Sequence, residues 1–152
     1  MGIYKSEKGK KAILSFYEKQ LKRMNKKYED IYIDTSFGKT HLIEPGNMSG
    51  NPLLVFHGGN ATTAYNLLAC DFLMNDFHIY AVDTIGHPGK SAEVSLSPNN
   101  YDYGKWTAEV IEKLGFKKII IPKNNIEKIT SKDIEIIEVQ KLTEAIVACV
   151  SK

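Results

Sequence analysis

Apolar side chains recur at helical spacing in several stretches of the chain. Within residues 8–27 they form one stripe opposite a lysine-rich face, which predicts an amphipathic helix with Ile13, Phe16, Tyr17, Leu21 and Met24 turned inward. In residues 61–75 the inward stripe includes Tyr65 and Phe72. The same spacing predicts further helices at residues 101–114 and 142–150, and a short one at 124–131.

Short apolar or alternating runs between these helices predict strands. A Gly-bearing turn at residues 36–39 separates the first two runs and predicts an antiparallel hairpin, in which His41 simply takes part in the alternation. After the hairpin, strands and helices alternate, a pattern typical of a parallel sheet covered on both faces. The fold class is therefore α/β, a three-layer αβα domain with six strands at residues 31–35, 40–44, 53–56, 77–83, 118–122 and 134–139.

The third strand carries the most informative stretch. Four apolar residues, 53–56, are followed by His57, Gly58, Gly59 and Asn60. The glycines allow a sharp turn and leave backbone N–H groups uncovered at the strand's carboxyl end, where ligands bind in open α/β sheets. Gly58, Gly59 and Asn60 are therefore candidates for binding a small anion. The simpler interpretation is that Asn60, Thr62 and Asn124 cap their own helices.

Composition limits the classes of partner. The chain has 152 residues, 43% of them hydrophobic and 25% charged, which suits one soluble domain over residues 1–152. A net charge of +2 is too small to predict a nucleic-acid partner. Basic residues gather in the first 28 positions, where we expect a solvated helix face; a phosphate-binding or membrane-surface patch is the alternative.

Cysteine usage and hydropathy predict a cytoplasmic protein. Cys70 and Cys149 fall in apolar helical patterns, so we expect buried free thiols in a reducing compartment. No run approaches the roughly 20 apolar residues of a membrane span, and the charged first residues do not form a signal peptide. His57, His87 and Asp83 lack metal-ligand spacing, so no metal and no cofactor is expected.

Three features of residues 10–116 resemble the N-terminal half of a bacterial α/β-hydrolase of the esterase/lipase kind. They are the run 54–59 (LVFHGG), the run Asp83–Ser91, which is similar to the family's D-x-x-G-x-G-x-S with Pro88 intruding, and the helix leading into residues 114–116. The resemblance implies strand order 1-2-4-3-5-6, with the N-terminal hairpin at one edge of a mostly parallel six-stranded sheet. It also implies that the HGG run helps to build an oxyanion hole.

The family's nucleophile has no counterpart in this sequence. The resemblance requires G-x-S-x-G after the fifth strand, where this chain has Pro122 to Asn125, and the motif occurs nowhere else. No histidine follows His87, so the family's late acid and late histidine are also without a match. The remnant catalytic candidates are His57, Ser91 and His87; a triad that draws on Thr62, Thr63 or Asp83 is conceivable.

The last part of the chain resembles a different family. Residues 114–125, 134–139 and 142–146 are similar to the end of the Lon protease domain and to the C-terminal domain of RadA-type proteins. We therefore expect a chimera joined at about residues 112–118, with a hydrolase-like part at about 1–116 and a βαβα part at about 117–152.

Together these patterns predict a catalytically inactive α/β-hydrolase-like scaffold, engineered or recombined. Two alternatives remain open: a weak esterase that uses a remnant site at His57 and the HGG run, or a small module that binds an anion or a partner. A homodimer through the edge strand at 134–139 is a further expectation.

Overall fold

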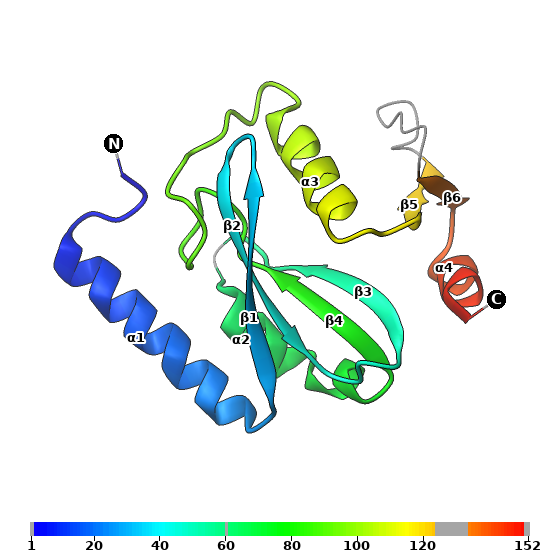
Figure 1. Ribbon diagram of the computed structural model, residues 1–152, viewed down its shortest axis with the longest axis horizontal. Coiled ribbons are helices and arrows are strands. Elements are labelled where there is room, and N and C mark those ends of the chain that lie inside the picture. Colours follow the sequence, from blue (N-terminus) through cyan, green and yellow to red (C-terminus); the bar gives the residue numbers. More distant parts are fainter. Residues whose placement is uncertain (1, 60, 124–133, 151–152) are drawn as a thin grey trace. The chain divides into compact units, whose positions relative to one another are not determined.

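The computed structural model describes residues 2–59, 61–123 and 134–150 (Figure 1). Its contacts divide the chain into two compact units, Met1–Val110 and Ile111–Lys152. The prediction of a single domain over residues 1–152 remains a prediction.

The first unit holds the hairpin, the HGG strand and their helices. Its helical and strand elements begin and end within a few residues of the predicted ones, apart from residues 61–75, which divide into an α-helix and a 3₁₀ turn. In chain order they are α1 (Glu7–Met24), β1 (Tyr28–Thr35), β2 (Gly38–Pro45), β3 (Asn51–Phe56), α2 (Thr63–Ala69), η1 (Asp71–Asn75), β4 (Phe77–Val82) and α3 (Asp102–Lys113). The last residues of α3, from Ile111 on, belong to the second unit.

The first unit's sheet has four strands of mixed direction, in the order β1-β2-β4-β3. β1 and β2 pair antiparallel along their whole length, and β2 also runs antiparallel to β4, with Leu42 opposite Val82. Only β3 and β4 are parallel, with Leu54 opposite Tyr80. The predicted six-stranded, mostly parallel sheet is therefore wrong, because β5 and β6 hydrogen-bond to each other in a separate two-stranded sheet.

One face of the four-stranded sheet carries the main core. Side chains from α1 and α2 pack on odd-numbered positions of β2 and β4. The buried members are Tyr17, Leu21, Met24, Ile43, Ala64, Leu67, Met74, Ile79 and Ala81. Strand side chains alternate between the two faces of a sheet, so the odd-numbered residues His41 and Asp83 lie on the face that the helices cover.

The opposite face receives the start of α3. Trp106 is buried, and its indole N–H donates to the Thr40 hydroxyl at 2.8 Å. Thr40 and Leu42 are even-numbered positions of β2, so they face away from α1. Helices thus contact both sides of this sheet within the first unit.

The second unit contains β5 (Lys118–Pro122), β6 (Glu135–Val139) and α4 (Leu142–Val150). The two strands are parallel, with Ile120 opposite Ile137. The short helix predicted at 124–131 lies outside the described residues. So does the Cys149 side chain, whereas Cys70 is only half-buried, because it stands where α2 gives way to the 3₁₀ turn η1.

No helix in the described part of the chain is long and apolar enough to cross a membrane.

Candidate functional site

The HGG turn joins the carboxyl end of β3 to the start of α2. Gly58 C=O accepts the Ala61 N–H at 3.0 Å, and the Thr62 hydroxyl caps α2 by accepting the Tyr65 N–H at 3.4 Å. Among the described residues, no acceptor contacts the N–H groups of Gly58 and Gly59. Both glycines are exposed, so these two donors are accessible from solvent and free to meet an acceptor there.

The two glycines are not required by backbone conformation. Neither Gly58 nor Gly59 has a positive φ, so neither uses the left-handed conformation that glycine alone adopts readily. A Cβ placed on either one would meet nothing within 4 Å. The space over this part of the turn is therefore open. Asn60, the third predicted anion-binding residue, lies outside the described residues.

His57 is buried and ties the HGG turn to the loop after β4. Its Nδ1 donates to the Gly58 C=O at 2.9 Å, and its Nε2 accepts the Thr84 N–H at 3.3 Å. One nitrogen must carry a proton and the other must not, so the geometry fits a neutral ring. In this arrangement both ring nitrogens are engaged by the backbone.

His87, the second histidine candidate, lies beside His57. The two ring centroids are 5.6 Å apart, and the Tyr103 ring centroid lies 6.4 Å from that of His87. Burial and the nearby His57 lower the pKa of His87, which favours its neutral form. No Ser or Thr hydroxyl or Cys thiol in the described ranges hydrogen-bonds to either imidazole.

Ser91, the third remnant candidate, is a buried structural bridge. Its hydroxyl donates to the Asp83 C=O at 2.6 Å and accepts the His41 N–H at 2.8 Å. The structure thus brings His57 and His87 together, but Ser91 hydrogen-bonds to β2 and its own loop rather than to either ring.

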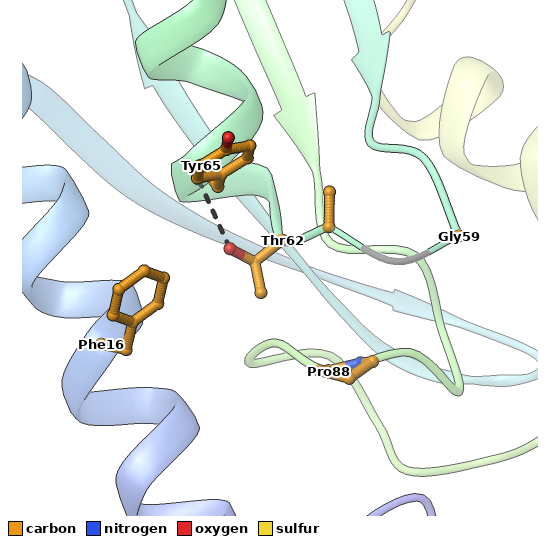
Figure 2. Close-up of a pocket in the computed structure, with 6 residues that line it drawn as sticks. Phe16, Gly59, Thr62, Tyr65 and Pro88 are labelled. Carbon is orange, nitrogen blue, oxygen red and sulfur yellow. Dashed lines mark hydrogen bonds between the residues drawn. The ribbon is translucent and has the colours of Figure 1, made fainter.

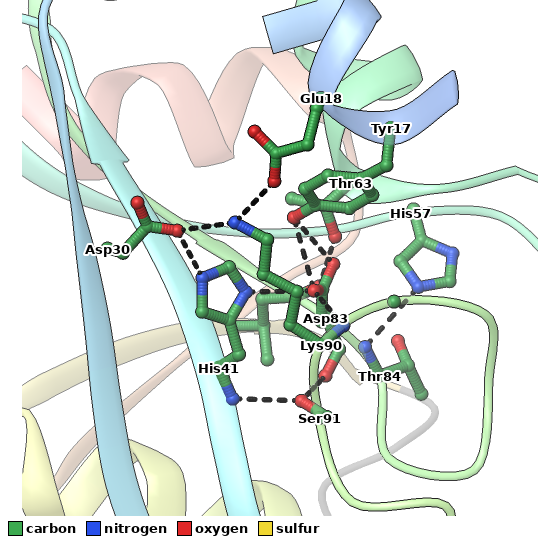
Figure 3. A network of polar contacts seen from close by, with 12 residues as sticks. Tyr17, Glu18, Asp30, His41, His57, Thr63, Asp83, Thr84, Lys90 and Ser91 are labelled. Atoms are coloured by element: carbon green, nitrogen blue, oxygen red, sulfur yellow. Dashed lines mark hydrogen bonds and ion pairs between the residues drawn. The ribbon is translucent and has the colours of Figure 1, made fainter. Parts of the chain in front are cut away.

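Asp83 organises the loop that follows β4 (Figure 3). Its fully buried carboxylate accepts from the Tyr17 hydroxyl at 3.1 Å to each oxygen, from His41 Nδ1 at 2.8 Å and from the Lys90 N–H at 2.8 Å. Gly89 passes so close that a Cβ there would lie 2.6 Å from the Asp83 Cγ. The Asp83–Ser91 motif therefore encodes a loop wrapped around a carboxylate.

The network continues outward through His41 and Lys90. His41 Nε2 lies 2.7 Å from an Asp30 oxygen, so a carboxylate faces each ring nitrogen. Lys90 Nζ lies 2.8 Å from Asp30 and 2.8 Å from Glu18 (Figure 3). Sequence reasoning missed these pairings, because periodicity assigns His41 to a strand but does not reveal its cross-chain partners.

Charges within the network shift the ionisation of its members. Burial alone would raise the pKa of Asp83, but hydrogen bonds from His41 and the Lys90 N–H outweigh it and hold that pKa below its usual range. The pKa of Asp30 is likewise lowered, because Lys90 and His41 outweigh its partial burial. Burial and the Asp83 charge raise the pKa of Tyr17, so its phenol keeps the proton that it donates.

A cavity of about 400 Å³ opens beside the HGG turn (Figure 2). Its walls come from α1, the turn itself, the start of α2 and the Asp83–Ser91 loop. The lining residues are Phe16, Gly59, Ala61, Thr62, Tyr65 and Pro88. Phe16 and Tyr65, predicted to face the core, are instead 49% and 56% exposed.

Comparison with known proteins identifies the class of this fold. The chain matches no protein-family model. The solved naproxen esterase (carboxylesterase NP) from Bacillus subtilis superposes with a TM-score of 0.67 at 29% identity, covering 77% of this chain and 41% of that one. Carboxylesterase CesB (YbfK) from the same organism gives a TM-score of 0.64 at 27% identity, covering 74% and 40%. The fold is therefore α/β-hydrolase-like.

The particular relatives found by sequence are carboxylesterases of Bacillus subtilis (strain 168). The uncharacterized carboxylesterase nap is 34% identical over 104 residues, which are 67% of this chain and 34% of the relative. Carboxylesterase YbfK is 31% identical over 101 residues, 66% of this chain and 34% of the relative. The chain spans about a third of the length of these curated relatives.

These matches confirm the predicted α/β-hydrolase relationship over about two-thirds of the chain. None of the relatives described above is a Lon protease or a RadA protein, so the second resemblance and the chimera are without support. A helix ending in Gly115 before an apolar strand is common to many α/β proteins, and such a local pattern does not distinguish between families.

Proposed function

We propose that this chain provides the carbonyl-binding half of an esterase-type α/β-hydrolase site. The N–H groups of Gly58 and Gly59 would hold the carbonyl oxygen of a carboxylic ester, and the attacking nucleophile would come from outside these 152 residues. The uncovered donors at the carboxyl end of β3 carry this proposal. Similarity to carboxylesterases over the same stretch supports it.

The chemistry of acyl transfer explains why such donors matter. Attack on an ester carbonyl carbon moves negative charge onto its oxygen, and fixed N–H donors stabilise that charge without reorganising. Removing one such donor from a working site typically costs about 3–4 kcal/mol of transition-state stabilisation. A carboxylate presents similar oxygens and is a suitable probe of the half-site.

The catalytic half of the reaction has no support in the described residues. His57 uses both ring nitrogens to join two loops, and the Ser91 hydroxyl is committed to backbone groups. We therefore expect the chain to bind carboxylates and carbonyls without hydrolysing esters by itself.

Amide NMR tests the binding half of the proposal. Titration of the ¹⁵N-labelled chain with sodium acetate should shift the Gly58 and Gly59 amide signals along a saturating curve. Gly50, whose N–H donates to the Asn47 C=O at 2.8 Å, provides a control amide that should respond only to ionic strength. Unchanged Gly58 and Gly59 signals at the highest acetate concentration would overturn the proposal.

Ester hydrolysis tests the catalytic half. The rate with p-nitrophenyl butyrate should equal the buffer rate, and a fluorophosphonate should leave the mass of the chain unchanged. Turnover above buffer that disappears in His57→Ala would instead support a self-sufficient weak esterase.

One observation favours that weak esterase as a second candidate. The lowered pKa of His87 keeps its imidazole neutral near pH 7, where it can take a proton from water. In that case turnover would be lost in His87→Gln and would fall as pH drops through the pKa of His87.

A phosphate titration followed at the same two glycine amides tests the remaining possibility, a module that binds small inorganic anions.

A further inference from the structure

We infer that the exposed face of α1 docks the chain onto an anionic lipid surface. The basic side chains of this face would contact the lipid headgroups, and the rings of Phe16 and Tyr65 would enter the boundary between headgroups and acyl chains. Because none of the backbone donors of the HGG turn takes part, this docking is independent of the carbonyl-binding half-site.

Positive charge is concentrated at the start of the chain. Nine Lys and Arg residues against Glu7 and Glu18 give residues 1–28 a formal charge of +7. Because the whole chain carries +2, the remaining residues carry −5. An anionic surface attracts the first part of such a chain and repels the rest, so the chain would approach that surface with α1 first.

The exposed face of α1 carries one sign of charge beyond the first turn. Every charged residue of the exposed class from position 8 to the end of the helix is basic, and these residues are Lys8, Lys11, Lys19, Lys22 and Arg23. Within the described ranges none of the five lies in an ion pair with a carboxylate. The helix has 18 residues, so this basic face extends over about 27 Å.

The acidic residues that could neutralise this face are engaged elsewhere. Glu18 is the only acidic residue of α1 beyond its first turn, and its carboxylate lies 2.8 Å from Lys90 Nζ. Glu93 pairs with Lys10, which is not on the exposed face. Like charges three or four residues apart, such as Lys19 and Arg23, destabilise a helix, and an anionic partner would relieve that repulsion.

An aromatic ring lies among these cations. Phe16 stands three residues before Lys19 and seven before Arg23, so helical spacing places all three on one face. Its ring is 49% exposed, and the Tyr65 ring, which lines the same cavity, is 56% exposed (Figure 2). Exposed aromatic rings beside a lysine-rich helix face are typical of helices that lie in a membrane interface.

The kind of cation favours lipid over nucleic acid. Four of the five unpaired cations are lysines, which attract phosphate as point charges without a fixed geometry. Base and phosphate recognition in nucleic acids depends more on the planar fork of arginine. Clusters of four to eight basic residues on an amphipathic helix are typical of binding to anionic lipids.

Co-sedimentation of the intact chain with lipid vesicles tests the docking. Vesicles of about one part phosphatidylserine to two parts phosphatidylcholine should bind the chain at least about tenfold more tightly than phosphatidylcholine alone. The affinity should fall as salt is raised, because salt screens the attraction between exposed charges. Equal binding to both kinds of vesicle would overturn the inference.

Paired substitutions locate the contact on α1. Lys19→Gln with Lys22→Gln should weaken binding to phosphatidylserine vesicles about twentyfold, since each basic residue at such a surface contributes about fivefold. The matched control, Lys39→Gln with Lys113→Gln, removes two exposed lysines outside α1 and should bind like the unaltered chain. An equal loss in both pairs would overturn the role of α1 and leave only an effect of net charge.

A second pair on the same helix guards against a folding effect. Lys8→Gln with Lys11→Gln leaves residues 19 and 22 unchanged and should also weaken vesicle binding about twentyfold. Far-UV circular dichroism and urea unfolding should be the same in all three paired variants. Full vesicle binding by either α1 pair would overturn the inference.

Fluorescence tests the entry of the ring. In Phe16→Trp the emission should shift to shorter wavelength when phosphatidylserine vesicles are added, whereas the buried Trp106 gives a constant background. An unshifted spectrum in the vesicle-bound chain would overturn the part of the inference that concerns Phe16.

Nucleic acid is the competing polyanion. A short DNA duplex and a short single-stranded RNA should each bind more weakly than phosphatidylserine vesicles at the same ionic strength. Tighter binding of either one, lost in Lys19→Gln with Lys22→Gln, would overturn the lipid surface as the partner of α1.

Discussion

Asp83 is the residue on which the local structure around the site depends. Its carboxylate receives hydrogen bonds from α1 through Tyr17, from β2 through His41 and from its own loop through the Lys90 N–H. A buried charge is tolerated only when it is paired and hydrogen-bonded, and these donors meet that requirement. Because the same loop carries Thr84 and Pro88, Asp83 helps to position both the partner of His57 and one cavity wall.

Acid should destabilise the chain through this carboxylate. The pKa of Asp83 is lower in the folded chain than the value of about 3.9 typical of an unfolded one, so its contribution to stability is full above that range. The contribution is lost as pH falls through the folded-state pKa. Urea unfolding followed from pH 7 to pH 2 should therefore show a steep acid decline that is shallower in Asp83→Asn. Asp34→Asn, at an exposed position of β1, should keep the full slope; equal slopes in all three proteins would contradict this role for Asp83.

Substitution by alanine should have opposite effects on the free energy of unfolding at two glycines near the site. At Gly59 the added Cβ enters open space, so Gly59→Ala should keep the free energy of unfolding or raise it by up to about 1 kcal/mol while weakening acetate binding. At Gly89 the Cβ would lie 2.6 Å from the Asp83 Cγ, so Gly89→Ala should lower stability by about 1–3 kcal/mol. Urea denaturation gives both values, and a large loss in Gly59→Ala would show that the turn needs glycine for folding.

The first helix serves two purposes with adjacent residues. Ser6 caps α1 by accepting the Gly9 N–H, and Asn25 ends it with a left-handed conformation. Tyr17 and Leu21 then pack in the core, whereas Phe16 contributes to the cavity wall. A stripe that looks uniform in sequence is therefore divided between packing and the cavity wall.

Alanine substitutions along α1 should separate these purposes. Leu21→Ala removes a buried side chain and should cost about 2–5 kcal/mol. Phe16→Ala removes a half-exposed ring and should cost much less, within about 1 kcal/mol. Thermal and urea unfolding measure both variants. A loss in Phe16→Ala as large as that in Leu21→Ala would mean that the Phe16 ring is part of the core.

At the scale of the whole molecule, the two units differ in the number of strands in their sheets and in the helices that pack on them. The unit Met1–Val110 has four strands with helical side chains on both faces. In the unit Ile111–Lys152 the described residues form two parallel strands and a helix. Two-stranded sheets are marginal by themselves, so the units should differ in local stability.

Hydrogen exchange of the intact chain measures this difference directly. Backbone amides of Ile43 and Ile79, at the centre of the first sheet, should exchange slowly, at rates set by global unfolding. Amides of Ile119 and Ile121 in β5 should exchange at least about tenfold faster. Matching protection in both units would show that they unfold as one cooperative body.

Local pattern in the sequence was sufficient to predict most elements of this protein. Apolar spacing located α1, the hairpin and α4, and the LVFHGG run identified β3 and its turn, because helix and strand periodicity depend on neighbouring residues alone. The motifs at residues 54–59 and 83–91 also led to the α/β-hydrolase relationship.

Tertiary structure alone decided the pairings between distant residues. β5 joined β6 rather than the four-stranded sheet, because strand pairing depends on hydrogen bonds between segments and not on the apolar character of either strand. His41 meets Asp83 across 42 positions, and Phe16 lies at a cavity although its spacing matched the core. Periodicity states which side of an element is apolar; what that side contacts is determined only when the chain has folded.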